Sequence, residues 1–290
     1  MTAPEPAGPA APLDARPAAP LDARPAAPLD ARPAATVMLV RDTPIGINVF
    51  LMRRHAAMEF AAGVMVFPGG GVDDRDRNAG IGWAGPDPSW WAHRFGVDTD
   101  LAAALVCAAA RETFEESGVL FAGRDDEPGS IVGDASVYGD SRAALADGSL
   151  SFADFLTQER LILRADLLRP WANWVTPKEE RSRRYDTYFF VGALPEGQRA
   201  DGDNTETDRA DWTTPQAALA DFEAGRTFLL PPTWTQLDSL GTRSVADVLA
   251  VQRRIVPVEP RLTVSHGNWE IEFFDSERYN RARSHRSPGE

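Results

Sequence analysis

The stretch that decides the fold is Ala110-Arg111-Glu112-Thr113-Phe114-Glu115-Glu116-Ser117-Gly118-Val119. A helix repeats about every 3.6 residues, so Glu112, Glu115 and Glu116 fall on one face within about one turn. The preceding segment, Leu101 to Ala110, is nearly all apolar or alanine. We therefore expect a helix that packs on a core and presents three carboxylates together.

Three carboxylates on one helical face need a positive partner. Like charges at this spacing destabilise a helix by about 0.2–0.5 kcal/mol per exposed pair, and burial without a partner costs more. Carboxylate oxygens are the ligands that Mg²⁺ and Mn²⁺ prefer. We expect either a divalent cation or Arg111 beside the glutamates, and the alternative is a solvated acidic patch on a surface helix.

A glycine-rich turn, Phe67-Pro68-Gly69-Gly70-Gly71, lies upstream, and Gly118 is placed to cap the helix. Pro-Gly-Gly followed by Arg-Glu-x-x-x-Glu-Glu-x-Gly resembles the Nudix box, the loop–helix–loop of the Nudix pyrophosphohydrolases. The usual box has its first glycine and an acidic residue shortly before the arginine. Here about 40 residues separate Gly70 from Arg111, so an insertion interrupts the box. Asp76 follows Gly70 at the spacing of the family's first glutamate, but the insertion argues against equating the two.

Two further passages resemble the coenzyme A-cleaving branch of the Nudix family. Residues 63–70 fit its Gly-x-x-x-Phe-Pro-Gly-Gly pattern, after a predicted strand that ends in arginine. Trp174-Val175-Thr176-Pro177, followed by Arg183-Arg184-Tyr185-Asp186-Thr187, resembles the peroxisomal coenzyme A diphosphatase subgroup. These passages favour coenzyme A or an acyl-coenzyme A as the substrate.

The resemblance implies the Nudix fold, an α/β architecture in which a mixed sheet lies between helices. We place this domain at residues 36–240, with the insertion at about 72–98, and expect a C-terminal extension of a helix and a hairpin at 241–290. It also implies hydrolysis of a phosphoanhydride in a small-molecule diphosphate, with Mg²⁺ or Mn²⁺ as cofactor. The rival substrates are NADH, ADP-ribose or a nucleotide sugar. A catalytically silent Nudix domain that senses a nucleotide is the alternative of another class.

Residue roles follow from the same resemblance. The metal ligands would be Glu112, Glu115, Glu116 and the carbonyl of Gly70. Arg111 would orient a neighbouring carboxylate, and Glu115 or Glu206 would take the proton of the attacking water. The substrate phosphates would be bound by Arg53, Arg54 and Arg184, or by Arg183 in place of its neighbour.

Composition restricts the partners and the compartment. The formal net charge of −13 argues against non-specific nucleic-acid binding, which depends on clustered lysine and arginine. The single cysteine, Cys107, falls in the apolar part of the motif helix and is expected in the core. No run is long and apolar enough to predict a membrane span, and no secretory signal is recognised. We expect a cytoplasmic protein, with a homodimer as a possibility by analogy with the family.

The remaining chain gives coarser expectations. Residues 1–35 contain an Ala-Ala-Pro-Leu-Asp-Ala-Arg-Pro repeat and predict a disordered tail. Residues 36–40 and 47–52 predict a hairpin. The insertion reads as a loop whose tryptophans (Trp83, Trp90 and Trp91) either stack on a nucleobase or pin the loop to the domain. The arginines from Arg278 to Arg286 predict a solvated tail.

Overall fold

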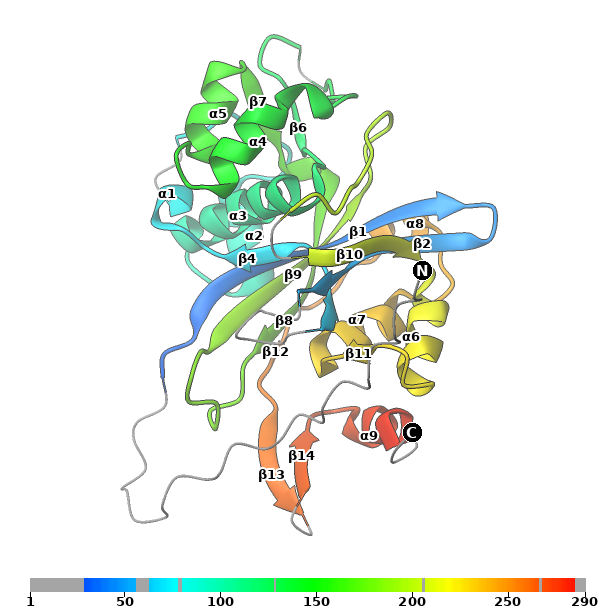
Figure 1. Cartoon of the computed structure of the whole chain (residues 1–290). Coiled ribbons are helices and arrows are strands. Elements are labelled where there is room, and N and C mark those ends of the chain that lie inside the picture. The colour runs from blue at the N-terminus through cyan, green and yellow to red at the C-terminus, as the bar shows by residue number, and fades with distance from the viewer. Residues whose placement is uncertain are drawn as a thin grey trace, which may run out of the picture.

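The computed structural model describes residues 29–55, 63–77, 80–127, 129–204, 207–265 and 268–284. Its main sheet contains β1 (Arg32–Thr43), β2 (Gly46–Arg54), β3 (Val64–Val66), β4 (Gly69–Gly71), β8 (Leu168–Val175), β9 (Tyr185–Ala193), β10 (Thr207–Thr213), β11 (Phe228–Leu229) and β12 (Pro257–Val258). The order is β11–β3–β2–β1–β9–β8–β12, with β10 paired to β2 and β4 paired to β1 (Figure 1). This sheet is mixed, as predicted.

β1 is the strand on which the sheet is built. It pairs in parallel with β9 and antiparallel with both β2 and β4. The predicted hairpin is confirmed as β1 and β2, but β1 begins at Arg32, inside the segment predicted as a tail. Its first residues are ordered because they pair with β9 on one side and with the glycine turn on the other.

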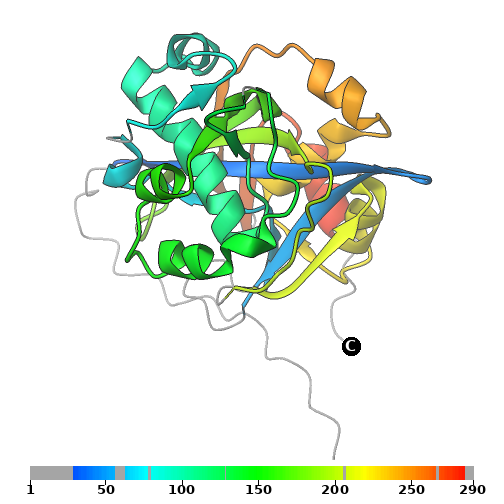
Figure 2. The same cartoon turned by 90° about the horizontal axis from the view of Figure 1, so that it is seen from above.

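Helices cover both faces of the sheet. One face carries α2 (Pro88–Phe95), α3 (Thr99–Ser117), α4 (Gly139–Ala146) and α5 (Phe152–Gln158), and the other carries α6 (Pro215–Glu223), α7 (Pro231–Leu240), α8 (Val245–Ala250) and α9 (Ser276–Ser284). Because side chains alternate along a strand, Val37 and Leu39 of β1 join the core under α3, and Met38 and Val40 join the core under α6 and α7. Viewed from above, α3 lies across β1 (Figure 2). The predicted α/β class is confirmed.

The insertion is more structured than the sequence indicated. It contains α1 (Asp74–Arg77), β5 (Trp83–Ala84) and α2, and β5 joins a small sheet with β7 (Leu161–Arg164) and β6 (Ala122–Arg124). Trp91 is fully buried, and the indole N–H groups of Trp83 and Trp91 both donate to the carbonyl of Pro86. Trp91 packs against Phe190 of β9, with ring centroids 5.6 Å apart, and therefore holds the insertion against the domain.

The C-terminal extension forms the predicted hairpin, β13 (Arg261–Ser265) and β14 (Asn268–Glu272), followed by α9. The arginines from Arg278 to Arg283 are exposed, as predicted, but they belong to α9 and not to a tail. Tyr279 and Ala282 of α9 are buried, and the Tyr279 hydroxyl donates to the carbonyl of Leu229 at 2.8 Å. Two 3₁₀ turns, Ser136–Tyr138 and Ala165–Leu167, complete the described elements. None of the described helices has the length and apolar character needed to cross a membrane.

Candidate active site

α3 carries the three glutamates, and both of its ends are capped. The side chain of Asp98 accepts a hydrogen bond from the backbone N–H of Leu101 at 2.7 Å, as an N-cap does. Gly118 ends the helix at a φ of +71°, a left-handed conformation that favours glycine. Between them the alanine-rich face is buried against the sheet. The glutamates therefore project from a fixed helix beside the glycine turn.

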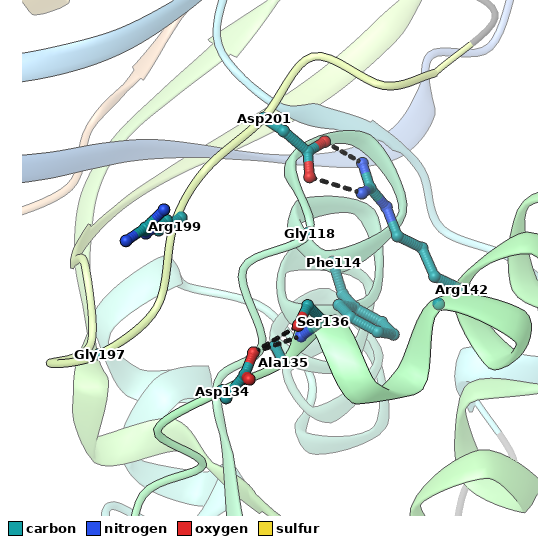
Figure 3. Close-up of a pocket in the computed structure, with 10 residues that line it drawn as sticks. Phe114, Gly118, Asp134, Ala135, Ser136, Arg142, Gly197, Arg199 and Asp201 are labelled. Carbon is teal, nitrogen blue, oxygen red and sulfur yellow. Dashed lines mark hydrogen bonds and ion pairs between the residues drawn. The ribbon is translucent and has the colours of Figure 1, made fainter.

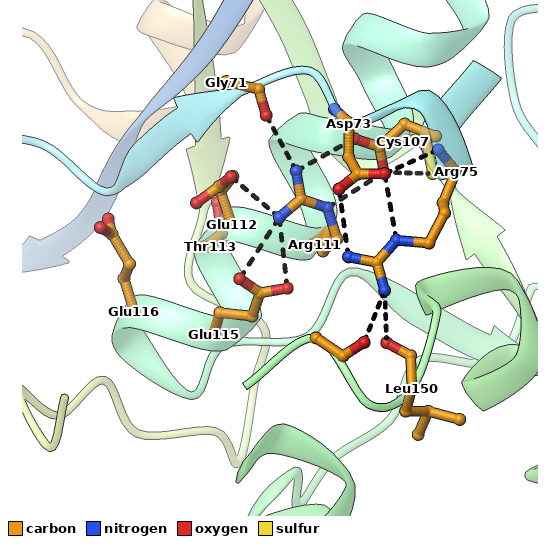
Figure 4. A network of polar contacts seen from close by, with 12 residues as sticks. Gly71, Asp73, Arg75, Cys107, Arg111, Glu112, Thr113, Glu115, Glu116 and Leu150 are labelled. Atoms are coloured by element: carbon orange, nitrogen blue, oxygen red, sulfur yellow. Dashed lines mark hydrogen bonds and ion pairs between the residues drawn. The ribbon is translucent and has the colours of Figure 1, made fainter. Parts of the chain in front are cut away.

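Arg111 lies at the centre of a buried polar network (Figure 4). Its Nε and Nη2 atoms donate to the two carboxylate oxygens of Asp76, both at 3.0 Å. Nη2 also donates to the carbonyl of Gly71 at 3.0 Å. Arg111 and Asp76 are only 9% and 4% exposed. The bidentate contact with Asp76 fixes the plane of the guanidinium. The hydrogen bond to Gly71 connects α3 to the glycine turn.

The remaining nitrogen of Arg111 faces the glutamates. Nη1 lies 2.8 Å from Oε1 of Glu112 and 3.2 Å from Oε1 of Glu115. Burial raises the pKa of Glu112 to about 7, against the opposing charge of Arg111. Burial likewise raises the pKa of Glu115. Burial alone would lower the pKa of Arg111, but the charges of Glu112, Asp76 and Glu115 hold it above its usual value. One arginine thus pairs with three carboxylates, those of Asp76, Glu112 and Glu115.

Asp76 is the site residue that the sequence reasoning set aside. It lies on α1, inside the insertion, and its side chain accepts hydrogen bonds from the backbone N–H of Asp73 at 2.8 Å and from the thiol of Cys107 at 3.5 Å. The spacing from Gly70 was the signal that could have identified it. Most of the inserted residues follow Asp76, so the spacing from Gly70 to Asp76 stays intact and α1 folds back onto Arg111.

The glycine turn approaches the glutamates closely. The backbone N–H of Gly69 donates to Oε2 of Glu116 at 2.7 Å. A Cβ atom on Gly70 would lie 2.6 Å from the carboxyl carbon of Glu112. Only a residue without a side chain leaves that carboxylate its present position, which explains glycine here. The role of the Gly70 carbonyl as a metal ligand stays a prediction.

We expect Gly70→Ala to lower kcat by about 10–100-fold, the effect typical of disturbing a group that orients a metal ligand. The added methyl would displace the Glu112 carboxylate, which is the movable end of a flexible side chain, so the melting temperature should change little. Gly71→Ala is the matched control, because a Cβ there meets nothing within 4 Å. Steady-state kinetics and thermal unfolding of both variants check this. Equal losses in the two variants would contradict it.

A pocket of 440 Å³ opens beside the turn. Glu112 and Glu116 line it together with Arg54 at the end of β2 and Arg183 just before β9. Its other walls are glycines, small polar residues and an apolar set formed by Val66, Phe67, Phe189, Leu230 and Pro232. The pocket therefore combines two carboxylates, two guanidinium groups and an apolar surface.

The other two predicted phosphate-binding arginines lie elsewhere. Nε of Arg53 is 2.6 Å from Oδ1 of Asp208, and Arg53 does not line this pocket. Arg184 is buried, and its Nη2 lies 2.6 Å from Oε1 of Glu259 while Nε and Nη2 donate to the carbonyl of Thr176. Arg184 thus holds the hairpin that joins β8 to β9. Its neighbour Arg183 is the residue that reaches the pocket.

The loop after β9 is tied to the end of α3. Arg142 of α4 makes a bidentate contact with Asp201, at 2.8 and 3.0 Å (Figure 3). Its Nε atom also donates to the carbonyl of Glu115 at 3.0 Å. The side-chain amide of Asn204 donates to the carbonyl of Glu116 at 2.8 Å. These contacts bring the loop close to the glutamate-bearing turn. Glu206, predicted as a possible base on this loop, lies outside the described residues.

Two carboxylates in the pocket suit a magnesium ion. Mg²⁺ is commonly bound by one or two carboxylates together with water and substrate phosphates, and Glu112 and Glu116 supply that number. In the described part of the chain no three acidic, histidine or cysteine side chains gather closely enough to hold a metal by themselves. The residues fit an ion that is completed by the phosphates of the substrate.

Comparison with known proteins identifies the class. The chain superposes on a NUDIX hydrolase from Alicyclobacillus acidocaldarius with a TM-score of 0.62 and 26% identity, over 78% of this chain and 98% of that one. The fold is therefore the Nudix fold. A family model described as the NUDT19 Nudix domain matches residues 89–240, just over half of the chain. The chain belongs to this family.

Curated relatives lie in the same branch. The chain is 28% identical to the acyl-coenzyme A diphosphatase NUDT19 of Xenopus laevis over 225 residues. That alignment covers 67% of this chain and 59% of that protein. It is also 28% identical to the acyl-coenzyme A diphosphatase NUDT19 of Homo sapiens over 235 residues. That alignment covers 67% of this chain and 60% of that protein. The chain spans about three fifths of the length of the curated relatives it matches.

Proposed function

We propose that this protein hydrolyses the phosphoanhydride of coenzyme A or an acyl-coenzyme A, with Mg²⁺ or Mn²⁺ as cofactor. The observation that carries the proposal is the pocket, where two carboxylates of the Nudix helix and two arginines line one cavity. Similarity to proteins named acyl-coenzyme A diphosphatases supports the choice of substrate. Water would cleave the diphosphate bridge into two phosphomonoesters, 3′,5′-ADP and a 4′-phosphopantetheine.

The cofactor would be held by Glu112 and Glu116, with Glu115 as a further predicted ligand. When bound, it would neutralise charge on the diphosphate and lower the pKa of a coordinated water. Arg111 keeps Glu112 and Glu115 in place through its Nη1 atom, while Asp76 and the Gly71 carbonyl fix the guanidinium itself. The carboxylates are therefore positioned before the substrate arrives, which reduces the rearrangement that the reaction requires.

The substrate would lie across the pocket. Arg54 and Arg183 would bind diphosphate oxygens, because a guanidinium matches a phosphate with two parallel hydrogen bonds. Phe67, Phe189 and the other apolar residues offer a surface for the adenine or the pantetheine arm. Glu115 or Glu206 would take the proton of the attacking water. Glu115 already lies within the Arg111 network, and burial raises its pKa, which suits a proton acceptor.

The decisive experiment is a substrate panel of coenzyme A, an acyl-coenzyme A, NADH and ADP-ribose, each with Mg²⁺ and with EDTA. Mass spectrometry of the products would identify the cleaved bond. We expect the largest kcat/KM for coenzyme A or its acyl derivative and no turnover with EDTA. Preference for NADH or ADP-ribose would select the rival substrates, and binding without turnover of any compound would indicate a nucleotide sensor.

We expect Arg183→Gln to raise the KM for coenzyme A by about 10–100-fold, because a hydrogen bond to a charged group contributes roughly 1.5–3 kcal/mol. The fold should be unaffected, since Arg183 is exposed at the mouth of the pocket. Arg181→Gln is the matched control, because Arg181 belongs to the same loop and does not line the pocket. Initial-rate kinetics would test both. An unchanged KM in Arg183→Gln would remove this residue from the substrate site.

A further inference from the structure

A second pocket, of 310 Å³, lies between α2, the start of β8 and the segment that follows α8. Arg94 of α2, Arg169 of β8 and Arg253 after α8 all line it. It shares no residue with the catalytic pocket, so the two are separate cavities. Three arginines from three distant parts of the sequence therefore converge on one small cavity.

Each of the three guanidinium groups is held in place by neutral groups. The Cζ atom of Arg253 lies 3.7 Å from the ring centroid of Trp171, and that of Arg94 lies 4.8 Å from the ring centroid of Trp90. Arg169 donates through Nη1 to the carbonyls of Asp166 and Leu168 at 2.7 and 2.8 Å. Contact with an aromatic face leaves the N–H edge of a guanidinium available to an anion.

Among the residues that the structure describes, no carboxylate forms an ion pair with any of these three arginines, although the charge of Asp166 acts on Arg169 from nearby. Asp166 is the acidic residue in the lining, and both of its oxygens already accept from Arg164, at 2.8 and 2.7 Å. Burial, together with the charge of Arg243, lowers the pKa of Arg253 to about 10. In a chain whose formal net charge is −13, this pocket holds uncompensated positive charge.

We infer that this pocket is a binding site for a phosphate group, either inorganic phosphate or the phosphate of a phosphomonoester, separate from the catalytic pocket. Three fixed guanidinium groups provide both the charge and the planar donors that a phosphate requires. The tryptophan and proline residues of the wall make one side of the pocket apolar, and a lower local dielectric strengthens the interaction between charges. The inference does not depend on the proposed function.

Isothermal titration calorimetry of the full chain would test this site. The titrations would use inorganic phosphate, AMP and, as a control without phosphate, adenosine, in chloride buffer of constant ionic strength with EDTA. We expect saturable binding of inorganic phosphate, of AMP or of both, and none of adenosine. The phosphate and AMP arms show whether the free ion or the monoester is preferred.

Variants assign the binding to this pocket. Arg94→Gln combined with Arg253→Gln should weaken phosphate binding at least about tenfold, while Arg183→Gln in the catalytic pocket should leave it unchanged. Arg94→Gln alone should weaken it measurably, and this partly exposed position keeps the test valid if the double variant fails to fold. Three results would overturn the inference: no saturable binding, binding that the Arg94 and Arg253 substitutions do not weaken, and binding that only Arg183→Gln removes.

Discussion

Replacing Glu116 by glutamine should lower kcat for coenzyme A hydrolysis by about a thousandfold or more. Charge stabilisation by a bound metal is worth several kcal/mol in the transition state, and each 1.4 kcal/mol or so corresponds to about tenfold in rate. Glutamine keeps the oxygen that accepts the hydrogen bond from the Gly69 backbone, so the geometry of the turn should survive. The charge alone is removed, and with it the affinity for a divalent cation.

Three measurements make this prediction specific. Steady-state kinetics over a range of Mg²⁺ concentrations should show that the loss is not recovered at saturating metal. Thermal unfolding in EDTA should give nearly the same melting temperature as the unsubstituted protein. Glu223→Gln, an exposed glutamate at the end of α6, is the control and should retain full activity. Near-normal turnover of Glu116→Gln would remove Glu116 from the site.

Replacing Arg111 by methionine should lower the free energy of unfolding by about 3–5 kcal/mol, the range seen when one member of a buried ion pair is removed. The cause would be the buried carboxylate of Asp76, with Glu112 and Glu115 adding to it, because all three lose their cationic partner. Methionine is a suitable replacement since it fills similar space without charge. Urea unfolding measured in EDTA, where no cation can compensate, would give the value.

A double-mutant cycle separates the Arg111–Asp76 pair from the rest. Asp76→Asn combined with Arg111→Met should be less destabilised than the sum of the two single variants, by about 0.5–3 kcal/mol. Arg124→Met is the control, since its pairing with Asp126 is exposed to solvent and should contribute little. Additive effects in the cycle would mean that the two residues do not act as a pair, contrary to the structure.

Local sequence was sufficient to predict the helix that carries the site. The apolar run, the cap at Asp98 and the glycine at its end all act within a few residues, so the helix follows from local rules. The pairing of β1 with β2 was predictable for the same reason, whereas the mixed sheet was implied by the family resemblance. The family followed from the spacing of the arginine and the glutamates.

What the sequence did not reveal depends on contacts between distant segments. Asp76 contacts Arg111 only because α1 folds back onto α3. The inserted residues between the two make this contact unrecognisable in the sequence. Arg183 is exposed and its neighbour Arg184 is buried. The difference arises because Arg184 forms an ion pair with Glu259, which lies far along the chain. α9 has a strongly polar sequence and is held by Tyr279 and Ala282, too few apolar residues for a recognisable pattern.

The parallel pairing of β1 with β9 sets the order in which the molecule can assemble. Val40 lies opposite Ala193, more than 150 residues later in the chain. At about 5–20 residues per second, a ribosome needs on the order of ten seconds to synthesise that interval. α3 is complete only about halfway through this interval, and from then until β9 is made the sheet beneath its alanine-rich face lacks the strand beside β1. Such non-local pairing slows folding, so the nascent chain exposes the alanine-rich face of α3 until β9 emerges from the ribosome.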